Sequence, residues 1–353
     1  TNPAGAVTMA STLAVTGNVD FNGDLDVDGT TNLDVVDVDG AVNFAADVTL
    51  ADGADLITAS AGTSNVRFGV NAGNSIASGG TRNTLIGDLA GTAITTGDYN
   101  VALGYAALDA EDAGSRATAL GYFALSSQNT DTDSYNVAVG FSAGESVTTA
   151  TLNTLIGGLA GDAITTGGAN TAVGYSALTT STTGSNNTSI GRESLRVTTT
   201  GSNNVGVGSY AMYDNTTGGS NVAIGESALS NNTTASNNTA VGKSALLANT
   251  TGANNTAAGY LALAANTTGN YNTATGIFAL TAATTATGNS AFGNSALKLT
   301  TTGASNTAVG SGALFENTSA SNNTAVGSNA LNANTTGTEN TAVGTDALSA
   351  TIT

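Results

Sequence analysis

The stretch NTAVGSNALNANTTG, residues 323–337, repeats with small changes along most of this chain of 353 residues. It consists of Asn, Thr, Ala, Ser and Gly with one Val and one Leu, and it holds no side chain that ionises near neutral pH. A segment of this composition offers little for catalysis. We therefore expect the repetition itself, through the structure that it builds, to carry the function.

The repeat has a fixed period over most of its length. A glycine ends the motif Asn-Thr-Ala-Val-Gly, or a close variant, seventeen times, and every step between Gly140 and Gly344 is 17 residues. Ala or, once, Ser follows the glycine by three residues, Leu or Met generally follows it by four, and a Thr-Thr-Gly turn closes most units. The earlier copies end at Gly69, Gly87, Gly104 and Gly121, with steps of 18, 17 and 17, and then of 19 to Gly140.

A unit of 17 residues is too short for two packed helices, and Thr, Val, Asn and Gly are poor helix formers. Its length fits one coil of a parallel β-solenoid, with two short strands and two turns. No proline occurs after residue 3, as expected if every strand pairs on both sides. We therefore predict an all-β protein in which residues 65–353 form a solenoid of 17 coils, roughly 80 Å long at ~4.8 Å per coil.

Alternation within the motif predicts which side chains face inward. We place the Val or Ile before the glycine inside the coil, as at Val173, Ile190 and Val241, together with the Leu that follows. The Asn and Ala of the motif then lie on the opposite face, where amide side chains stacked ~4.8 Å apart form a hydrogen-bonded ladder. The predicted ladder includes Asn170, Asn187, Asn238 and Asn323. A core of one Val and one Leu per coil is thin, which favours burial against other chains.

Residues 1–64 follow a different pattern, in which alternating apolar pairs recur mostly at steps of six residues. Leu13 with Val15 and Val19 with Phe21 are two such pairs, with glycines at the same step. One chain of these hexads buries little, so we predict a slender intertwined shaft. Residues 24–29, DLDVDG, match the start of an EF-hand loop, but the twelfth position lacks Glu, and we favour a solvated outer face over calcium.

Composition excludes several functional classes. The chain has no His and no Cys, which removes the most versatile side chains for proton transfer, nucleophilic attack and transition-metal binding. No general acid–base constellation stands out, so we predict no enzyme activity, no cofactor and no metal. A net charge of −18 with seven basic residues argues against nucleic acid and anionic membranes as partners. No apolar run approaches the ~20 residues of a membrane span.

Aromatic residues gather on neighbouring coils. Tyr105, Tyr122 and Phe141 directly follow the motif glycine on successive coils, and Phe123 stands beside Tyr122. A row of exposed rings could stack on sugars, which makes these four residues candidates for glycan contact. The alternative, which we favour, is that they fill a seam between chains. The 19-residue step holds a polar two-residue insertion within residues 126–135, which we expect to protrude from the solenoid and which could serve binding.

The N-T-A-V-G-x-x-A-L unit resembles the head repeats of YadA-like trimeric autotransporter adhesins, and the longer form with N-T-T-G resembles repeats in phage tail fibres. The resemblance covers about residues 65–350, and such fibres often also carry glycine-punctuated β hexads like those of residues 11–53. It implies a left-handed parallel β-roll packed as a homotrimer. The chain has no membrane anchor, coiled-coil stalk or C-terminal chaperone domain and begins with Thr, so we expect a fragment or a cleaved fibre.

Two functions are consistent with these patterns. The first is a structural fibre that carries or forms a host-attachment element, as in a phage or viral tail fibre on a virion, with itself, a host glycan or receptor and other tail proteins as partners. The second is a bacterial extracellular adhesin or surface filament. An ice-binding solenoid with rows of Thr is less favoured, because successive Thr hydroxyls point to opposite sides. Sparse carboxylates argue against a polysaccharide depolymerase.

Overall fold

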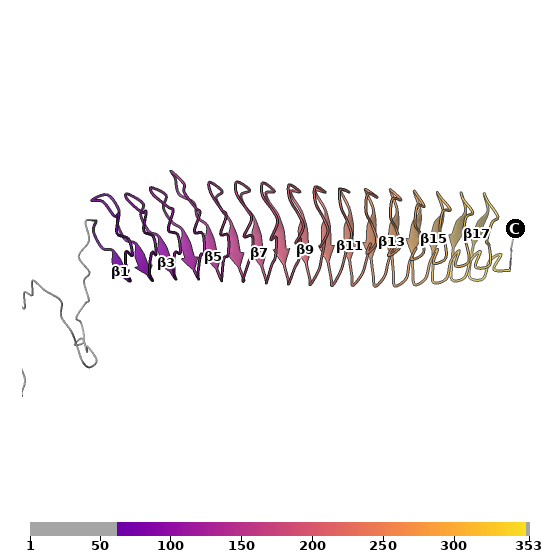
Figure 1. The fold of residues 1–353 in the computed structure, drawn as a ribbon. Coiled ribbons are helices and arrows are strands. Elements are labelled where there is room, and N and C mark those ends of the chain that lie inside the picture. The colour runs from indigo at the N-terminus through magenta and orange to yellow at the C-terminus, as the bar shows by residue number, and fades with distance from the viewer. Residues whose placement is uncertain (1–61, 351–353) are drawn as a thin grey trace, which may run out of the picture. The chain divides into compact units, whose positions relative to one another are not determined.

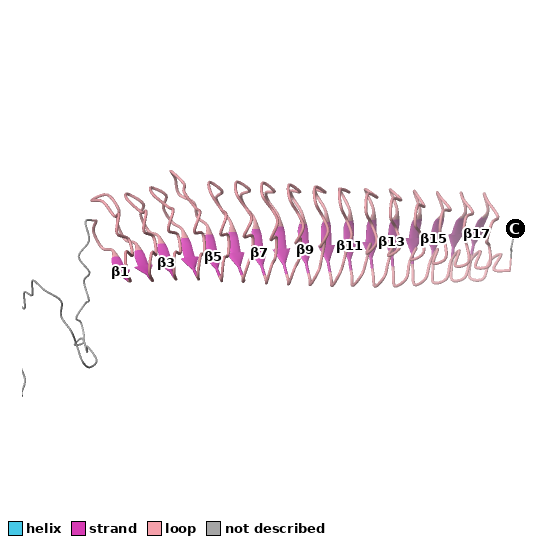
Figure 2. Cartoon of the chain, in the orientation of Figure 1, coloured by secondary structure: helices cyan, strands magenta, loops and turns pink. Residues whose placement is uncertain are grey.

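The computed structural model describes residues 62–350, which form a parallel β-solenoid (Figure 1). Seventeen strands alternate with turns, and these residues contain no helix (Figure 2). The predicted all-β solenoid is therefore confirmed. The hexad segment and the calcium candidate at residues 24–29 lie outside the described residues.

Each strand pairs in parallel with the strand of the next coil, so that equivalent residues stack along the solenoid axis. Thr239 lies opposite Thr256, and Ala240 lies opposite Ala257. The same register holds from the first strand to the last. The strands are β1 (Val66–Phe68), β2 (Thr84–Ile86), β3 (Val101–Leu103), β4 (Thr118–Leu120), β5 (Val137–Val139), β6 (Thr154–Ile156), β7 (Thr171–Val173), β8 (Thr188–Ile190), β9 (Val205–Val207), β10 (Val222–Ile224), β11 (Thr239–Val241), β12 (Thr256–Ala258), β13 (Thr273–Thr275), β14 (Ser290–Phe292), β15 (Thr307–Val309), β16 (Thr324–Val326) and β17 (Thr341–Val343).

Each coil contains one three-residue strand, so the prediction of two strands per coil is wrong. The remainder of the coil is a series of turns, yet its backbone still bonds to the next coil. Leu263 N donates to Ala279 O at 3.0 Å and Thr267 N donates to Thr284 O at 2.8 Å, both far from the strand. Stacking of identical turns therefore satisfies the backbone where a second strand was expected.

The direction of the strand side chains is opposite to the prediction. The middle residue of the strand is buried, as at Ala172 and Ala240, whereas Ile190 and Val241 are each 40% exposed. Val173 is only half-buried. The reason is that the Asn before the strand is buried and bonds across the coil, which by alternation turns the middle residue inward and the Thr and Val outward.

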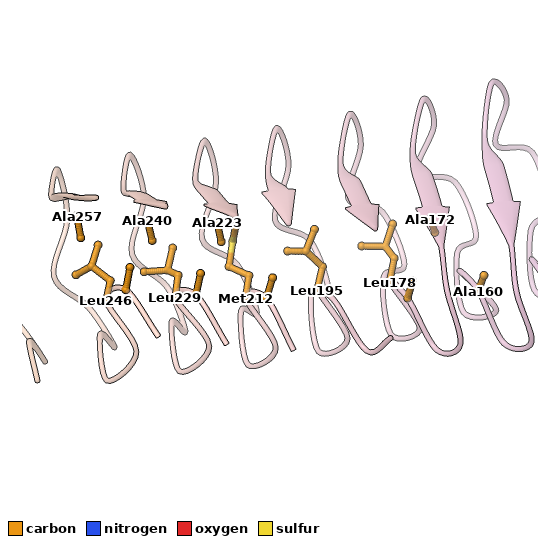
Figure 3. Close-up of a cluster of buried hydrophobic side chains, with 14 of the residues drawn as sticks. Ala160, Ala172, Leu178, Leu195, Met212, Ala223, Leu229, Ala240, Leu246 and Ala257 are labelled. Carbon is orange, nitrogen blue, oxygen red and sulfur yellow. The ribbon is translucent and has the colours of Figure 1, made fainter. Parts of the chain in front are cut away.

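The Leu of the turn does face inward, as predicted. Figure 3 shows Leu178, Leu195, Met212, Leu229 and Leu246 in one column beneath the small residues of the strands, and all five are fully buried. One Leu or Met and two small side chains, usually Ala, fill each of these coils. This narrow interior has no room for the Val side chains that the prediction placed there.

The turns require an unusual backbone. In each of most coils, three residues other than the motif glycine have φ near +55°, for example Ser176, Leu178 and Asn186 at +52°, +56° and +58°. Among residues 62–350, none of those in this left-handed conformation is Val, Ile or Thr, although these types are frequent there. Branching at Cβ makes that conformation costly, so the turns exclude the residue types that the strands prefer.

Four coils pack their interior in another way, with Gly in place of the buried Leu of the turn. At Gly161, φ is +57°, which matches Leu178 in the next coil. The missing volume is filled by Ile164 and Leu155, since a Cβ on Gly161 would lie 2.8 Å from a methyl carbon of each. In coils that keep the Leu, the position of Ile164 holds small or polar residues, such as Ser181. The repeat thus conserves interior volume rather than residue identity.

Candidate functional site

The interior carries an amide ladder that is continuous from Asn136 to Asn340 and is interrupted before that at Ala117. Along this stretch each motif Asn accepts a hydrogen bond at its Oδ1 from the backbone N–H of the next motif Asn. Asn238 Oδ1 accepts from Asn255 N at 2.9 Å, and Asn238 Nδ2 donates to Gly252 O on the far side of the coil at 2.9 Å. The four Asn residues named from the sequence are all buried and make the same bonds: Asn170, Asn187, Asn238 and Asn323.

A second amide ladder was missed by the sequence analysis. Asn232, Asn249 and Asn266 each donate from Nδ2 to the Oδ1 of the preceding rung, which for Asn232 is Asn215, at 2.8–2.9 Å. It ends at Asn266, whose Oδ1 has no partner because the next rung is Ala283. The sequence signal was the Asn immediately before Thr-Thr at the same 17-residue period. The two ladders lie side by side, since Asn249 and Asn238 both donate to Gly252 O, and from Asn215 to Asn266 both couple each coil to the next.

A buried carboxylate occupies the same interior column in the coil before the insertion. Glu111 accepts hydrogen bonds from Gly114 N at 2.8 Å, Gln128 Nε2 at 2.8 Å and Thr130 N at 3.1 Å. These bonds tie the base of the insertion to the interior, while residues 131–132 at its tip are exposed. In Figure 1 the loop between β4 and β5 extends beyond its neighbours.

The predicted aromatic residues do come together on the surface. The rings of Tyr105 and Tyr122 stack with centroids 5.2 Å apart, and those of Tyr122 and Phe141 stack at 5.5 Å and 8°. Phe123 packs edge-on against Tyr122 at 4.3 Å. Stacking along the axis covers both faces of Tyr122 and one face of each neighbour. A sugar therefore cannot lie across the whole row, and only the outer faces of the end rings remain open to it.

The basic residues are mostly held by rings and acids of the same surface. Arg116 packs over Tyr99 at 5.3 Å and over Tyr135 at 5.8 Å, and it forms an ion pair with Asp133 of the insertion. Arg192 similarly covers Tyr210 at 5.0 Å. These cation–π contacts hold the guanidinium groups against rings of neighbouring coils. We therefore interpret the Arg residues as stabilising the stacked coils and not as anion-binding sites.

Two acidic residues lie on adjacent coils, Glu145 and Asp162. The pKa of the Asp162 carboxyl is raised to about 6, mainly by burial and to a smaller extent by the charge of Glu145. One oxygen of Asp162 is buried without a hydrogen-bond partner. A pKa that is raised in the folded state means that stability is greatest below the unfolded value of 3.8 and is lost as the pH rises through about 6.

We therefore expect Asp162→Asn to raise the free energy of unfolding at pH 7 by about 1 kcal/mol, after discounting for the partial exposure of this side chain. The gain should largely disappear at pH 3.5, where the wild-type carboxyl is mostly protonated in both states. Urea denaturation at the two pH values measures it, with Asp131→Asn at the exposed insertion tip as control. An equal gain at both pH values would show that the charge of Asp162 is not the cause.

Threonine hydroxyls form two columns at the turn before the second glycine. The first hydroxyl of each pair bonds to the next coil, as where Thr182 Oγ1 donates to Thr199 O at 3.3 Å and Thr199 Oγ1 donates to Thr216 O at 3.1 Å. The second Thr, such as Thr183 or Thr200, is exposed. Only one column of hydroxyls is thus free at this turn, which is not the flat two-column array that an ice-binding surface would need.

The outer face of the strands is an uncharged surface. The first and third residues of all seventeen strands point outward, and none of them is charged. The first position is Thr, Val or Ser, and the third is mostly Val, Ile or Leu. Ile156, Ile224 and Val309 at the third position are 39–41% exposed. These two columns, which we call the strand face, run the length of the described solenoid.

Comparisons with known proteins do not add a function. No protein-family model and no curated protein matches the chain. Residues 62–350 contain no group of three or more acidic, His or Cys side chains that could hold a metal ion. Within the same residues, no helix is long and apolar enough to cross a membrane.

Proposed function

We propose that the protein is a structural attachment fibre, in which copies of this solenoid associate through the strand face and hold a binding surface away from the particle that bears them. A phage or viral tail fibre is the form we favour. The observation that carries the proposal is the strand face itself, an uncharged stripe with one mostly apolar column and one column rich in Thr, on a chain of net charge −18.

A second copy of the chain is the occupant that suits this face. A continuous column of exposed Val, Ile and Leu of this length is unusual on a monomer and marks an interaction surface. A copy has the same coil spacing, so its columns stay in step with those of its neighbour along the whole rod, which a partner of another fold would not do. The absence of charge in both columns means that copies can approach without repulsion there, while the acids elsewhere keep the assembled rods apart.

The two ladders and the repeated backbone bonds suit the mechanical part of the role. Every coil is bonded to its neighbours at the strand, at the turns and through buried amides. Bending the rod would stretch bonds on several sides of the coil at once. Such a stiff rod can hold a binding surface at a fixed distance from its base. The described residues form no cleft with catalytic groups.

The test is the mass of the full chain in solution. We expect light scattering to give a multiple of the 34.1 kDa chain mass, with three copies as the predicted number. Introducing Glu at Ile190 and Ile224 on the strand face should reduce the mass to that of one chain, because buried carboxylates would face each other across the interface. The matched control places Glu at Thr183 and Thr217, which are exposed at the turns just before the strands that contain Ile190 and Ile224.

A wild-type chain that is folded and monomeric at micromolar concentration would contradict the assembly. Attachment is tested separately by adding the labelled full chain to bacterial cells. If the chain assembles but binds no cell surface, the attachment role is contradicted and only a role as a structural filament remains.

A further inference from the structure

The aromatic row ends at a gap. Phe141 stacks on Tyr122 with one face, and among the described residues its ring has no other ring contact. The equivalent position on the next coil is Gly158, which has no side chain, and on the coil after that it is Tyr175. Phe141 and Tyr175 are each 57% exposed, more than the stacked Tyr105 and Tyr122 at 43% and 44%.

We infer that this gap, with Phe141 and Tyr175 as walls and the backbone of Gly158 as floor, binds one pyranose ring of a surface polysaccharide. The inference rests on the proposed attachment function and gives it a location. It also revises the sequence prediction, in which the row of rings as a whole was the candidate, because the stacked rings cover one another.

The two rings flank a space for one small ring. Corresponding backbone positions two coils apart are separated by ~9.6 Å, twice the spacing of paired strands. The Tyr175 ring leans from its coil toward Gly158, with a ring carbon 3.7 Å from the position of a Cβ there, so the space between the two rings is narrower than the backbone spacing. A saturated ring over Gly158 would contact Phe141 on one side and Tyr175 on the other. The axial C–H groups of a pyranose are then directed at the electron-rich faces of the two walls.

The floor is suited to an open gap. A Cβ built on Gly158 would meet only a ring carbon of Tyr175, at 3.7 Å, which is ordinary contact. Gly158 is also absent from the residues with positive φ. Neither the backbone nor packing therefore requires glycine here, in contrast to Gly157 immediately before it. A larger residue would fit, so the missing side chain leaves an accessible space that the fold does not need.

Accommodation of a side chain gives a clean test. Gly158→Tyr should continue the stack from Phe141 to Tyr175 and close the gap without loss of stability. Phe141→Ala removes one wall. The control, Ser311→Tyr, adds the same ring at the equivalent exposed position of a distant coil.

The experiment uses the full chain on an array of purified bacterial polysaccharides and pyranose oligosaccharides, followed by calorimetry with any glycan that binds. We expect Gly158→Tyr and Phe141→Ala to weaken binding at least tenfold, and Ser311→Tyr to leave it unchanged, while the unfolding midpoints of both Tyr variants match the wild type. Binding that Gly158→Tyr does not weaken, or no binding of the wild type to any glycan, overturns the inference. If the chain still assembles and attaches to cells in either case, the fibre proposal stands and only the location is wrong.

Discussion

Gly157→Ala should destabilise the solenoid by roughly 4 kcal/mol, while Gly158→Ala, one residue further on, should change its stability by less than about 0.5 kcal/mol. At Gly157 φ is +133°, a region that is open essentially to glycine alone. A Cβ there would lie 2.5 Å from the carbonyl oxygen of Gly174 on the next coil, closer than side chains approach in real structures.

The two costs at Gly157 arise from different causes and add. Backbone strain of ~1–3 kcal/mol comes from the conformation alone, and a further ~1–3 kcal/mol comes from pushing apart two coils that are bonded at several points. Urea denaturation followed by circular dichroism measures both variants against the wild type. Equal stability of the two variants would mean that coils can separate locally at this corner without cost.

The motif glycine shows what the sequence could and could not reveal. Its recurrence at 17 residues was enough to predict the parallel solenoid, because a short, proline-free unit of this kind has few other folds. The physical reason why this position must be Gly could not be predicted from the sequence. The structure shows that the glycines themselves stack, each Cα facing the carbonyl of the next, so that the corner is narrower than any other residue allows.

The error about the inward face has an equally specific cause. Hydrophobicity placed Val241 inside and Ala240 outside, since in most proteins the larger apolar residue is buried. The decisive residue was Asn238, which is buried because its amide bonds span the coil, and Leu246 of the turn then leaves room at the middle of the strand only for Ala. Leaving a buried amide without hydrogen-bond partners costs more free energy than exposing the extra methyl groups of Val. The Asn therefore determines which strand side chains face inward.

The turns also held a signal that the sequence analysis did not use. At the positions of Ser176, Leu178 and Asn186, none of the described coils has Val, Ile or Thr in the left-handed conformation. In a chain so rich in Thr, that exclusion predicts positive φ on physical grounds. The exchange of Leu for Gly161 with Ile164 was likewise present in the sequence. Its meaning depends on knowing that the two positions share one interior space.

The second large effect is expected at the ladder. Asn238→Ala should lower the free energy of unfolding by about 2–4 kcal/mol, because it leaves Asn255 N–H buried without a partner, removes one of the two amide donors to Gly252 C=O and opens a small cavity. Asn231→Ala, on the same stretch of chain but with an exposed side chain, is the matched control and should cost less than about 0.5 kcal/mol.

The position of Asn238 makes this more than a test of one hydrogen bond. It lies in the middle of the ladder, where its own backbone N–H bonds to Asn221 Oδ1 and its Oδ1 bonds to Asn255. In a stack where each coil contacts only its neighbours, a weak central interface divides the rod into two units. We therefore expect the variant to unfold in two steps in urea and to be cut by protease within the coils around residue 238. A single transition as steep as that of the wild type would show that backbone stacking, rather than the amide ladder, makes the solenoid cooperative.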